Sequence, residues 1–198
     1  MKVSKQQSAE NREAILEAAS RLFRERGIQG VGVAEIMAAA GFTHGGFYGH
    51  FASKEALAAE VIDRVYAHST EKLVERLEGL GAAEHFRQYL HPHHRDRAGN
   101  GCPMPTLAAD AAREMGPVSG ASARGIAGYL RELACHRPDG TVVQAPDEAD
   151  KARAILSLSA LVGGMVLARA THEAAPELSD EILARLPAQL EQAWFTPA

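Results

Sequence analysis

Cys102 is the residue of this chain with the clearest potential for covalent chemistry. It lies in the segment GCPMP at residues 101–105, directly before a helix that we predict over residues 106–115. A helix N-terminus lowers the pKa of a nearby thiol and favours the reactive thiolate. The alternative is that Cys102 packs under the preceding loop as a small apolar side chain. Cys135 ends a helix predicted over residues 118–135, and we do not expect a disulfide between the two.

A polar segment that we predict to be a loop, residues 91–101, holds three histidines: His91, His93 and His94. Imidazoles and a thiolate are ligands that zinc prefers, so a zinc site that includes Cys102 is one interpretation. The proline between the first two histidines, and the lack of helical or hairpin spacing, favour a solvated loop instead. We therefore predict no bound metal.

The chain has no Walker loop, no dinucleotide-binding fingerprint and no nucleophile with a visibly paired base. These absences argue against phosphate-transfer, redox and covalent hydrolytic enzymes. We predict that the protein is not an enzyme and needs no cofactor.

A second kind of chemistry, the recognition of DNA, is indicated by residues 32–54. Four apolar residues form one stripe on a helix predicted over residues 33–40: Val33, Ile36, Met37 and Ala40. Gly41 supplies a sharp turn before a second helix, predicted over residues 44–50, for which Thr43 is a suitable N-cap. A recognition helix reaches base edges through its N-terminal residues. We therefore predict DNA contacts from Thr43, His44, Gly45 and Gly46.

These residues, with the segment ILEAASRLFRERG at residues 15–27, resemble the N-terminal domain of TetR-family transcriptional regulators. The family's pattern for the first helix is matched by Ala18, Ala19, Leu22, Phe23, Glu25 and Gly27. Its aromatic signature is matched by Gly45, Tyr48, His50, Phe51, Lys54, Glu55 and Leu57. The resemblance implies that Tyr48 and His50 touch phosphates beside the recognition helix and that Lys54 opens the next helix against the DNA backbone.

Two departures from the family pattern bear on how DNA is read. Gly32 stands where the family usually has Thr or Ser, which removes an expected phosphate contact. Gly46 and Gly49 stand where a hydroxyl or a larger side chain is common. We therefore expect few direct base contacts, with more of the preference coming from His44, Thr43 and DNA shape.

The resemblance implies an all-α fold with two domains. Residues 1–53 would form a three-helix helix-turn-helix DNA-binding domain, and residues 54–198 a helical domain for effector sensing and dimerisation. The segment at residues 101–114 also resembles a subset of the family, which includes the repressor of N-ethylmaleimide reductase. In that subset a Gly-Cys pair opens a helix and the cysteine senses electrophiles or oxidants, a role that would fall to Cys102.

Helical patterns follow in the second half of the chain. We predict a long helix over residues 54–77, capped by Ser53 and ended by Gly79 and Gly81, and a short helix over residues 82–90. Small residues in the helix predicted over residues 106–115 would leave room for a ligand beside larger side chains. The predicted pocket residues are Phe86, Tyr89, Met104, Leu107 and Tyr129.

Two final helices are predicted, over residues 147–170 and from a Ser179 cap onward, with Pro187 as a kink. The first is apolar on all sides and so needs partners on all sides. The resemblance implies that the pair forms a two-fold four-helix bundle with a second copy, and the alternative is a thick monomer core. The predicted interface residues are Leu158, Leu161, Val162, Met165, Leu183, Leu186 and Leu190.

Charge and hydropathy indicate where in the cell the protein is located. Residues 1–55 hold seven Lys or Arg and six Asp or Glu, whereas the whole chain has a net charge of −4. No charged segment followed by an apolar one opens the chain, and the longest apolar stretch, residues 154–168, is shorter than the ~20 residues of a membrane span. We expect a cytoplasmic protein with no membrane partner.

We predict a homodimeric repressor that binds a pseudo-palindromic operator in double-stranded DNA. A small-molecule or electrophile effector would release it, either by binding or by modifying Cys102. Two alternatives stay open from the sequence: a helical carrier of hydrophobic ligands without a DNA function, and a TetR-like activator.

Overall fold

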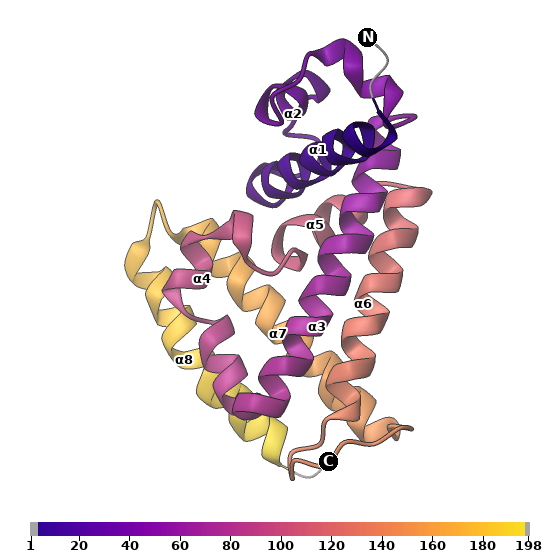
Figure 1. The fold of residues 1–198 in the computed structure, drawn as a ribbon. Coiled ribbons are helices and arrows are strands. Elements are labelled where there is room, and N and C mark those ends of the chain that lie inside the picture. Colours follow the sequence, from indigo (N-terminus) through magenta and orange to yellow (C-terminus); the bar gives the residue numbers. More distant parts are fainter. Residues whose placement is uncertain (1–3, 197–198) are drawn as a thin grey trace.

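Helices make up nearly all of the regular structure in the computed structural model, which describes residues 4–196 (Figure 1). Over these residues the single β-type pairing is an isolated bridge between His136 and Val142. In chain order the α-helices are α1 (Lys5–Arg26), α2 (Val33–Ala39), α3 (Lys54–Tyr89), α4 (Pro92–Asp96), α5 (Met104–Ala111), α6 (Pro117–Cys135), α7 (Glu148–Thr171) and α8 (Pro176–Phe195), and the 3₁₀ helices are η1 (His44–Gly49) and η2 (Ala98–Asn100). The predicted all-α fold is confirmed.

α1, α2 and η1 form a small bundle at one end of the molecule (Figure 1). A seven-residue helix such as α2 is not stable alone, because its nucleation costs more than a few hydrogen bonds return. Packing therefore holds it, through Phe23, Ile36 and Phe47, which are fully buried. Gly27 ends α1 and Gly41 separates α2 from η1, both at positive φ, which glycine adopts without strain.

α3 connects this bundle to the rest of the molecule. Its predicted cap is confirmed, because the Ser53 hydroxyl accepts a hydrogen bond from the Ala56 N–H at 3.1 Å. The helix bends at Gly81, whose φ is +78°. The bend agrees with the predicted break and divides α3 into a long arm, residues 54–80, and a short arm, residues 82–89.

α6 packs against α3 at close range. A Cβ atom added to Gly125 of α6 would overlap the side chain of Tyr66, so a larger residue has no room there. Tyr66 is fully buried and its hydroxyl accepts a hydrogen bond from the Ser122 hydroxyl at 3.3 Å. Burial raises the pKa of Tyr66 to about 12. This neutral, close contact holds the long arm to the body.

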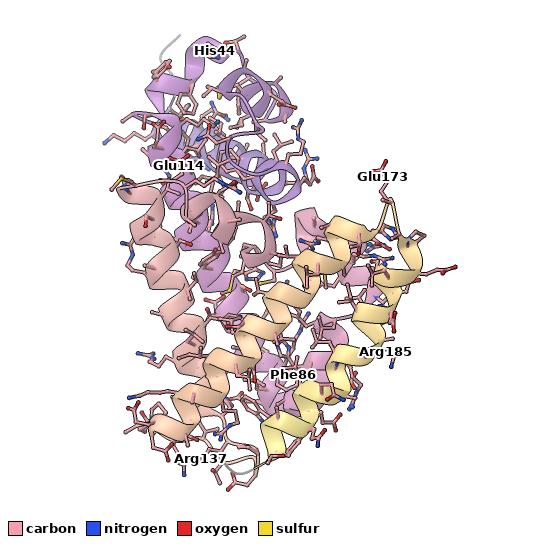
Figure 2. All side chains as sticks on the ribbon, turned by 180° about the vertical axis from the view of Figure 1, so that it is seen from behind. His44, Phe86, Glu114, Arg137, Glu173 and Arg185 are labelled. Atoms are coloured by element: carbon pink, nitrogen blue, oxygen red, sulfur yellow. The ribbon has the colours of Figure 1, made fainter. Side chains whose placement is uncertain are left out.

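α7 and α8 lie side by side and complete the body (Figures 1 and 2). Trp194 of α8 is buried against Phe86 of the short arm, with ring centroids 5.5 Å apart. α7 begins in a capping box in which Asp147 and Asp150 each accept the other's backbone N–H. Asp150 also pairs with Arg137 at 2.8 Å, which ties the end of α6 to the start of α7.

By length and composition alone, α7 could cross a membrane. It packs against α6 and α8, and its residues Ala154, Leu161 and Met165 are fully buried. These contacts agree with the predicted buried helix. Apolar residues on the rest of α7, such as Ile155 and Leu167, stay exposed.

The prediction of a loop over residues 91–101 is wrong for most of its length, since α4 and η2 lie there. Pro92 stands at the first helical position, where its missing N–H leaves no bond unmade. The Nδ1 atom of His91 caps α4 by accepting a hydrogen bond from the His93 N–H at 3.1 Å. The histidines therefore have structural partners, and in the described range no group of three or more His, Cys, Asp or Glu could hold a metal ion.

The predicted cap at Ser179 is also wrong. α8 begins at Pro176, and Ser179 is buried within its first turns. The Ser179 hydroxyl donates a hydrogen bond to the Ala168 carbonyl at 2.7 Å and accepts one from the Arg95 guanidinium at 2.9 Å. This serine joins α4, α7 and α8 instead of capping a helix. The helix expected over residues 106–115 is α5, which begins and ends earlier.

Candidate functional site

η1 presents small and polar residues at one extreme end of the molecule, where Figure 2 shows His44. Phe47 is fully buried and anchors the segment, whereas His44, Gly45 and Gly46 are exposed. Tyr48 is 68% exposed, and its ring packs edge-on against Phe47 with centroids 5.3 Å apart. An aromatic side chain held this far into solvent is available to a partner.

η1 is a 3₁₀ helix where the sequence predicts an α-helix. Glycines at three of its six positions disfavour regular α-helix by roughly 0.8–1 kcal/mol each relative to alanine. Thr43 occupies the N-cap position but makes no capping hydrogen bond, so that part of the prediction is wrong. Its hydroxyl is exposed beside His44.

Two basic residues flank η1. His50 ends the segment and Lys54 opens α3, and both are half-buried. Among the described residues, no carboxylate lies within ion-pairing distance of Lys54. A lysine at a helix N-terminus opposes the helix dipole, and the free backbone N–H groups there also favour an anion. Together they form a site suited to a phosphate.

A second concave site lies between α1, the two arms of α3, α4 and the segment before α5. This cleft has a volume of about 1270 Å³. Its wall includes Tyr89, Tyr129 and Cys102, three residues singled out from the sequence. Arg24 of α1 forms part of the wall, so the cleft lies directly beside the N-terminal bundle.

Cys102 is held by a short chain of hydrogen bonds. Its backbone N–H donates to the His94 Nε2 atom at 2.9 Å, and His94 Nδ1 lies 2.7 Å from the Tyr89 carbonyl. Nδ1 must carry the proton for both contacts to form, so His94 is the neutral Nδ1–H tautomer. The Ser69 hydroxyl lies 3.8 Å from the Cys102 sulfur. The thiol therefore sits in a polar corner of the cleft.

The expectation that a helix N-terminus activates Cys102 is wrong. α5 begins two residues later, at Met104, with Pro103 in the N-cap position. Burial raises the pKa of the Cys102 thiol, and the nearby Tyr89 and Ser69 side chains offset this only in part. The thiol is protonated at neutral pH, and reaction with an electrophile requires that its proton be lost.

Hydrogen bonds connect the cleft to the end of α1. The Arg24 guanidinium donates to the Gly101 carbonyl at 3.4 Å, next to Cys102. Two residues of α5 continue the connection. The Thr106 hydroxyl donates to the Arg24 carbonyl at 2.9 Å, and Asp110 accepts the backbone N–H of Ile28 at 2.6 Å. A change at Cys102 can therefore reach the bundle that carries η1.

The comparisons with known proteins agree with this geometry. Residues 15–61 match the family described as bacterial regulatory proteins, tetR family. The transcriptional repressor NemR of Escherichia coli (strain K12) is 28% identical over 139 residues, 66% of this chain and 70% of that protein. Residues 15–61 therefore form an N-terminal domain of the TetR-family type. The structure of reduced E. coli NemR superposes with a TM-score of 0.72 at 22% identity, covering 96% of this chain and 99% of that one.

Sequence likeness within the TetR family is strongest near the N-terminus. The transcriptional regulator AcrR of Shigella flexneri is 41% identical over 58 residues, which are 29% of this chain. The match spans only about a quarter of AcrR, 27% of its length. The likeness to the NemR structure extends to the body, but at this identity it establishes the fold alone.

α7 and α8, which lie side by side in Figure 2, carry an apolar surface. Gly163 and Leu167 from α7 and Ile182 and Leu186 from α8 line a groove there. Six large apolar residues of the two helices are exposed: Ile155, Leu156, Val166, Leu167, Leu178 and Phe195. Five of the seven interface residues predicted from the sequence belong instead to the core of the single chain. They are Leu158, Leu161, Met165, Leu183 and Leu190, all of which are buried. The other two, Val162 and Leu186, are only partly buried.

The predicted pocket is only partly assembled. Tyr89 and Tyr129 line the cleft, but Phe86, Met104 and Leu107 belong to the core and do not line it. Sequence reasoning missed the cationic lining, which includes Lys72 and Arg76. These two lie one turn apart on α3, where like charges destabilise a helix. That unfavourable pair was the one signal in the sequence that could have found them.

Proposed function

We propose that the protein is a homodimeric TetR-like regulator that represses transcription by binding a pseudo-palindromic operator. Residues 1–53 serve as the DNA-binding domain and residues 54–198 as the effector and dimerisation domain. The observation that carries the proposal is the exposed η1 segment, with Tyr48 and Lys54 beside it, inside the stretch that matches the family. Thr43, His44, Gly45 and Gly46 approach base edges, and Tyr48, His50 and Lys54 bind phosphates.

The exposed apolar face of α7 and α8 is the proposed dimer interface. Pairing of this face about a two-fold axis removes Leu156 and Leu167 from water. Gly163 in the groove allows close approach of a helix from the partner. A symmetric dimer presents two η1 segments, which fit half-sites about 34–36 Å apart.

The cleft is the proposed effector site. A ligand there, or a modification of Cys102, favours one arrangement of the long arm of α3 over another. The connection through Arg24, Thr106 and Asp110 carries the change to α1. Because the effector binds the two arrangements with different affinity, it changes the spacing of the two heads and lowers operator affinity.

Fluorescence anisotropy of labelled DNA from upstream of the protein's own gene tests this proposal. Wild-type protein should bind with an affinity that falls steeply with salt. Lys54→Gln should weaken binding to every DNA sequence, and the slope of log affinity against log salt concentration should become less steep by about one unit. Lys151→Gln, the same change on α7, is the matched control and should behave as wild type. Salt-independent binding, or equal slopes for both variants, would contradict the assignment.

The role of Cys102 is tested in the same assay with N-ethylmaleimide. Wild-type protein should lose operator affinity on treatment, and Cys102→Ser should bind DNA but ignore the reagent. Cys135→Ser should respond as wild type. If Cys102→Ser still responds, the reagent acts through another group such as Cys135, and the sensor role of Cys102 is refuted.

A further inference from the structure

The cleft has an excess of positive charge in a chain that is acidic overall. Six Arg or Lys and four Glu line it, an excess of two positive charges, whereas the whole chain carries −4. The buried histidines contribute no charge at neutral pH. Burial lowers the pKa of His85 to about 3 and that of His94 to about 4. The excess of positive charge therefore comes from Arg and Lys, and His85 and His94 add nothing to it near neutral pH.

The glutamates of the cleft are mostly paired already. Three of the four contact basic side chains in the cleft: Glu13 with Arg64, Glu71 with His68, and Glu84 with Arg87. Within residues 4–196 no carboxylate lies in ion-pairing distance of the remaining cations of the lining, which are Arg24, Lys72, Arg76 and Arg97. An anion bound between Lys72 and Arg76 would relieve their repulsion.

The inner wall carries polar atoms that lack partners. Neither the Tyr89 hydroxyl nor the His85 Nδ1 atom has an oxygen or nitrogen partner within the described chain, although the two residues are only 2% and 1% exposed. The Cys102 thiol, which lies beside the Tyr89 hydroxyl, is only a weak hydrogen-bonding partner. Tyr89 and His85 both line the cleft. Buried polar groups almost always have partners, so these two indicate that one is missing. Arg76 also lines the cleft, and after burial its charge contributes most to lowering the pKa of His85.

Apolar surface completes the lining. Leu16 of α1, Val65 and Leu73 of the long arm, and Pro103 contribute only their edges, because each is buried to about nine-tenths or more. A ligand with only charged groups would leave this surface in contact with water, and a purely apolar ligand would leave the cations and the Tyr89 hydroxyl without partners.

We propose that the cleft binds a small organic anion. Its apolar or aromatic body packs on Leu73 and Pro103, and its carboxylate, sulfonate or phosphate binds Lys72 and Arg76. An acceptor atom of the ligand accepts a hydrogen bond from the Tyr89 hydroxyl. The inference rests on the proposed function, in which this cleft is the effector site. It adds the chemical class of the effector, and the α1 wall lets such an anion bind the DNA-binding bundle directly.

Two fluorescent probes that differ in one charge test the proposal. Anilinonaphthalene sulfonate is an aromatic anion, and N-phenyl-naphthylamine is the same scaffold without the sulfonate. Wild-type protein should bind the anion about tenfold more tightly, the range expected for charge-assisted contacts. The double variant Lys72→Gln, Arg76→Gln should lose that preference and keep its affinity for the neutral probe. Lys151→Gln, which removes one charge outside the cleft, should retain the preference.

Tyr89→Phe keeps the ring and removes only the hydroxyl. It should weaken binding of the anion about three- to tenfold, the range of one neutral hydrogen bond. Equal affinity for the two probes, a preference that survives the double variant, or no binding of either probe would each overturn the proposal. Operator binding by wild-type protein is measured in the same buffer. If the protein prefers the anionic probe but does not bind the operator, the proposed function is refuted and the proposed ligand class stands. If it binds the operator but shows no preference for the anion, the proposed function stands and the ligand class is refuted.

Discussion

Asp110 offers a test of how the cleft is coupled to the DNA-binding bundle. Its carboxylate accepts the backbone N–H of Ile28 at 2.6 Å, the side chain is 15% exposed, and Ile28 is 3% exposed. Asp110→Ala removes a charged acceptor and leaves a buried N–H without a partner. Such a loss costs about 1.5–3 kcal/mol. For a chain of this size that corresponds to a fall in Tm of about 3–12 °C.

The matched control is Arg113→Ala, which removes the other partner of Asp110. The Arg113 side chain is 77% exposed and lies 3.7 Å from the carboxylate. Exposed ion pairs contribute about 0–1 kcal/mol, so this variant should unfold close to wild type in urea. Hydrogen exchange locates the effect, because the Ile28 amide should lose protection only in Asp110→Ala. That variant should also bind the operator yet respond less to an effector. If both variants lose the same stability, or the Ile28 amide stays protected, the coupling argument is wrong.

Three further predictions concern packing, assembly and pH. Gly125→Ala should destabilise the protein by about 1–3 kcal/mol in urea unfolding, because the added methyl overlaps Tyr66; an unchanged midpoint would mean that α3 and α6 separate freely. Leu167→Glu places a charge on the proposed interface and should give monomers in analytical ultracentrifugation, whereas a persistent dimer would move the interface elsewhere. The hydrogen bond from Arg137 lowers the pKa of Asp150 to about 2, below its value in an unfolded chain. Its contribution to stability is therefore present above about pH 4 and lost as the pH falls towards about 2. Asp150→Asn should remove that part of the acid dependence, as followed by circular dichroism.

The features that could be predicted from the sequence are those fixed by neighbouring residues. Ser53 caps α3 because its hydroxyl needs only the N–H three residues on, and Gly81 bends it because its φ is positive. Pro176 starts α8 because a proline at the first helical position leaves no hydrogen bond unmade. The prediction that Ser179 caps α8 is wrong because a serine near a helix start can also form hydrogen bonds with distant groups, here Arg95 of α4.

The features that could not be predicted depend on distant segments. Local position favours a low pKa for Cys102, but the surrounding cleft removes water and reverses the effect. The cations of the cleft lie on helices well separated in sequence, since Arg24 is on α1 and Arg76 on α3. The apolar residues of α7 predict a helix with partners on all sides, but no pattern tells which side, that of Leu161 or that of Leu167, faces the body of the single chain.

The glycines of η1 bear on how such a protein could acquire new targets. Gly45 and Gly49 have negative φ, and a Cβ atom built on either meets nothing within 4 Å. At Gly46 it would make only ordinary contact with Met37. Side chains can therefore be added at two exposed places of the reading segment without disturbing the core. Retargeting by single substitutions requires no compensating change elsewhere, which makes this segment a favourable starting point for evolving or designing altered operator specificity.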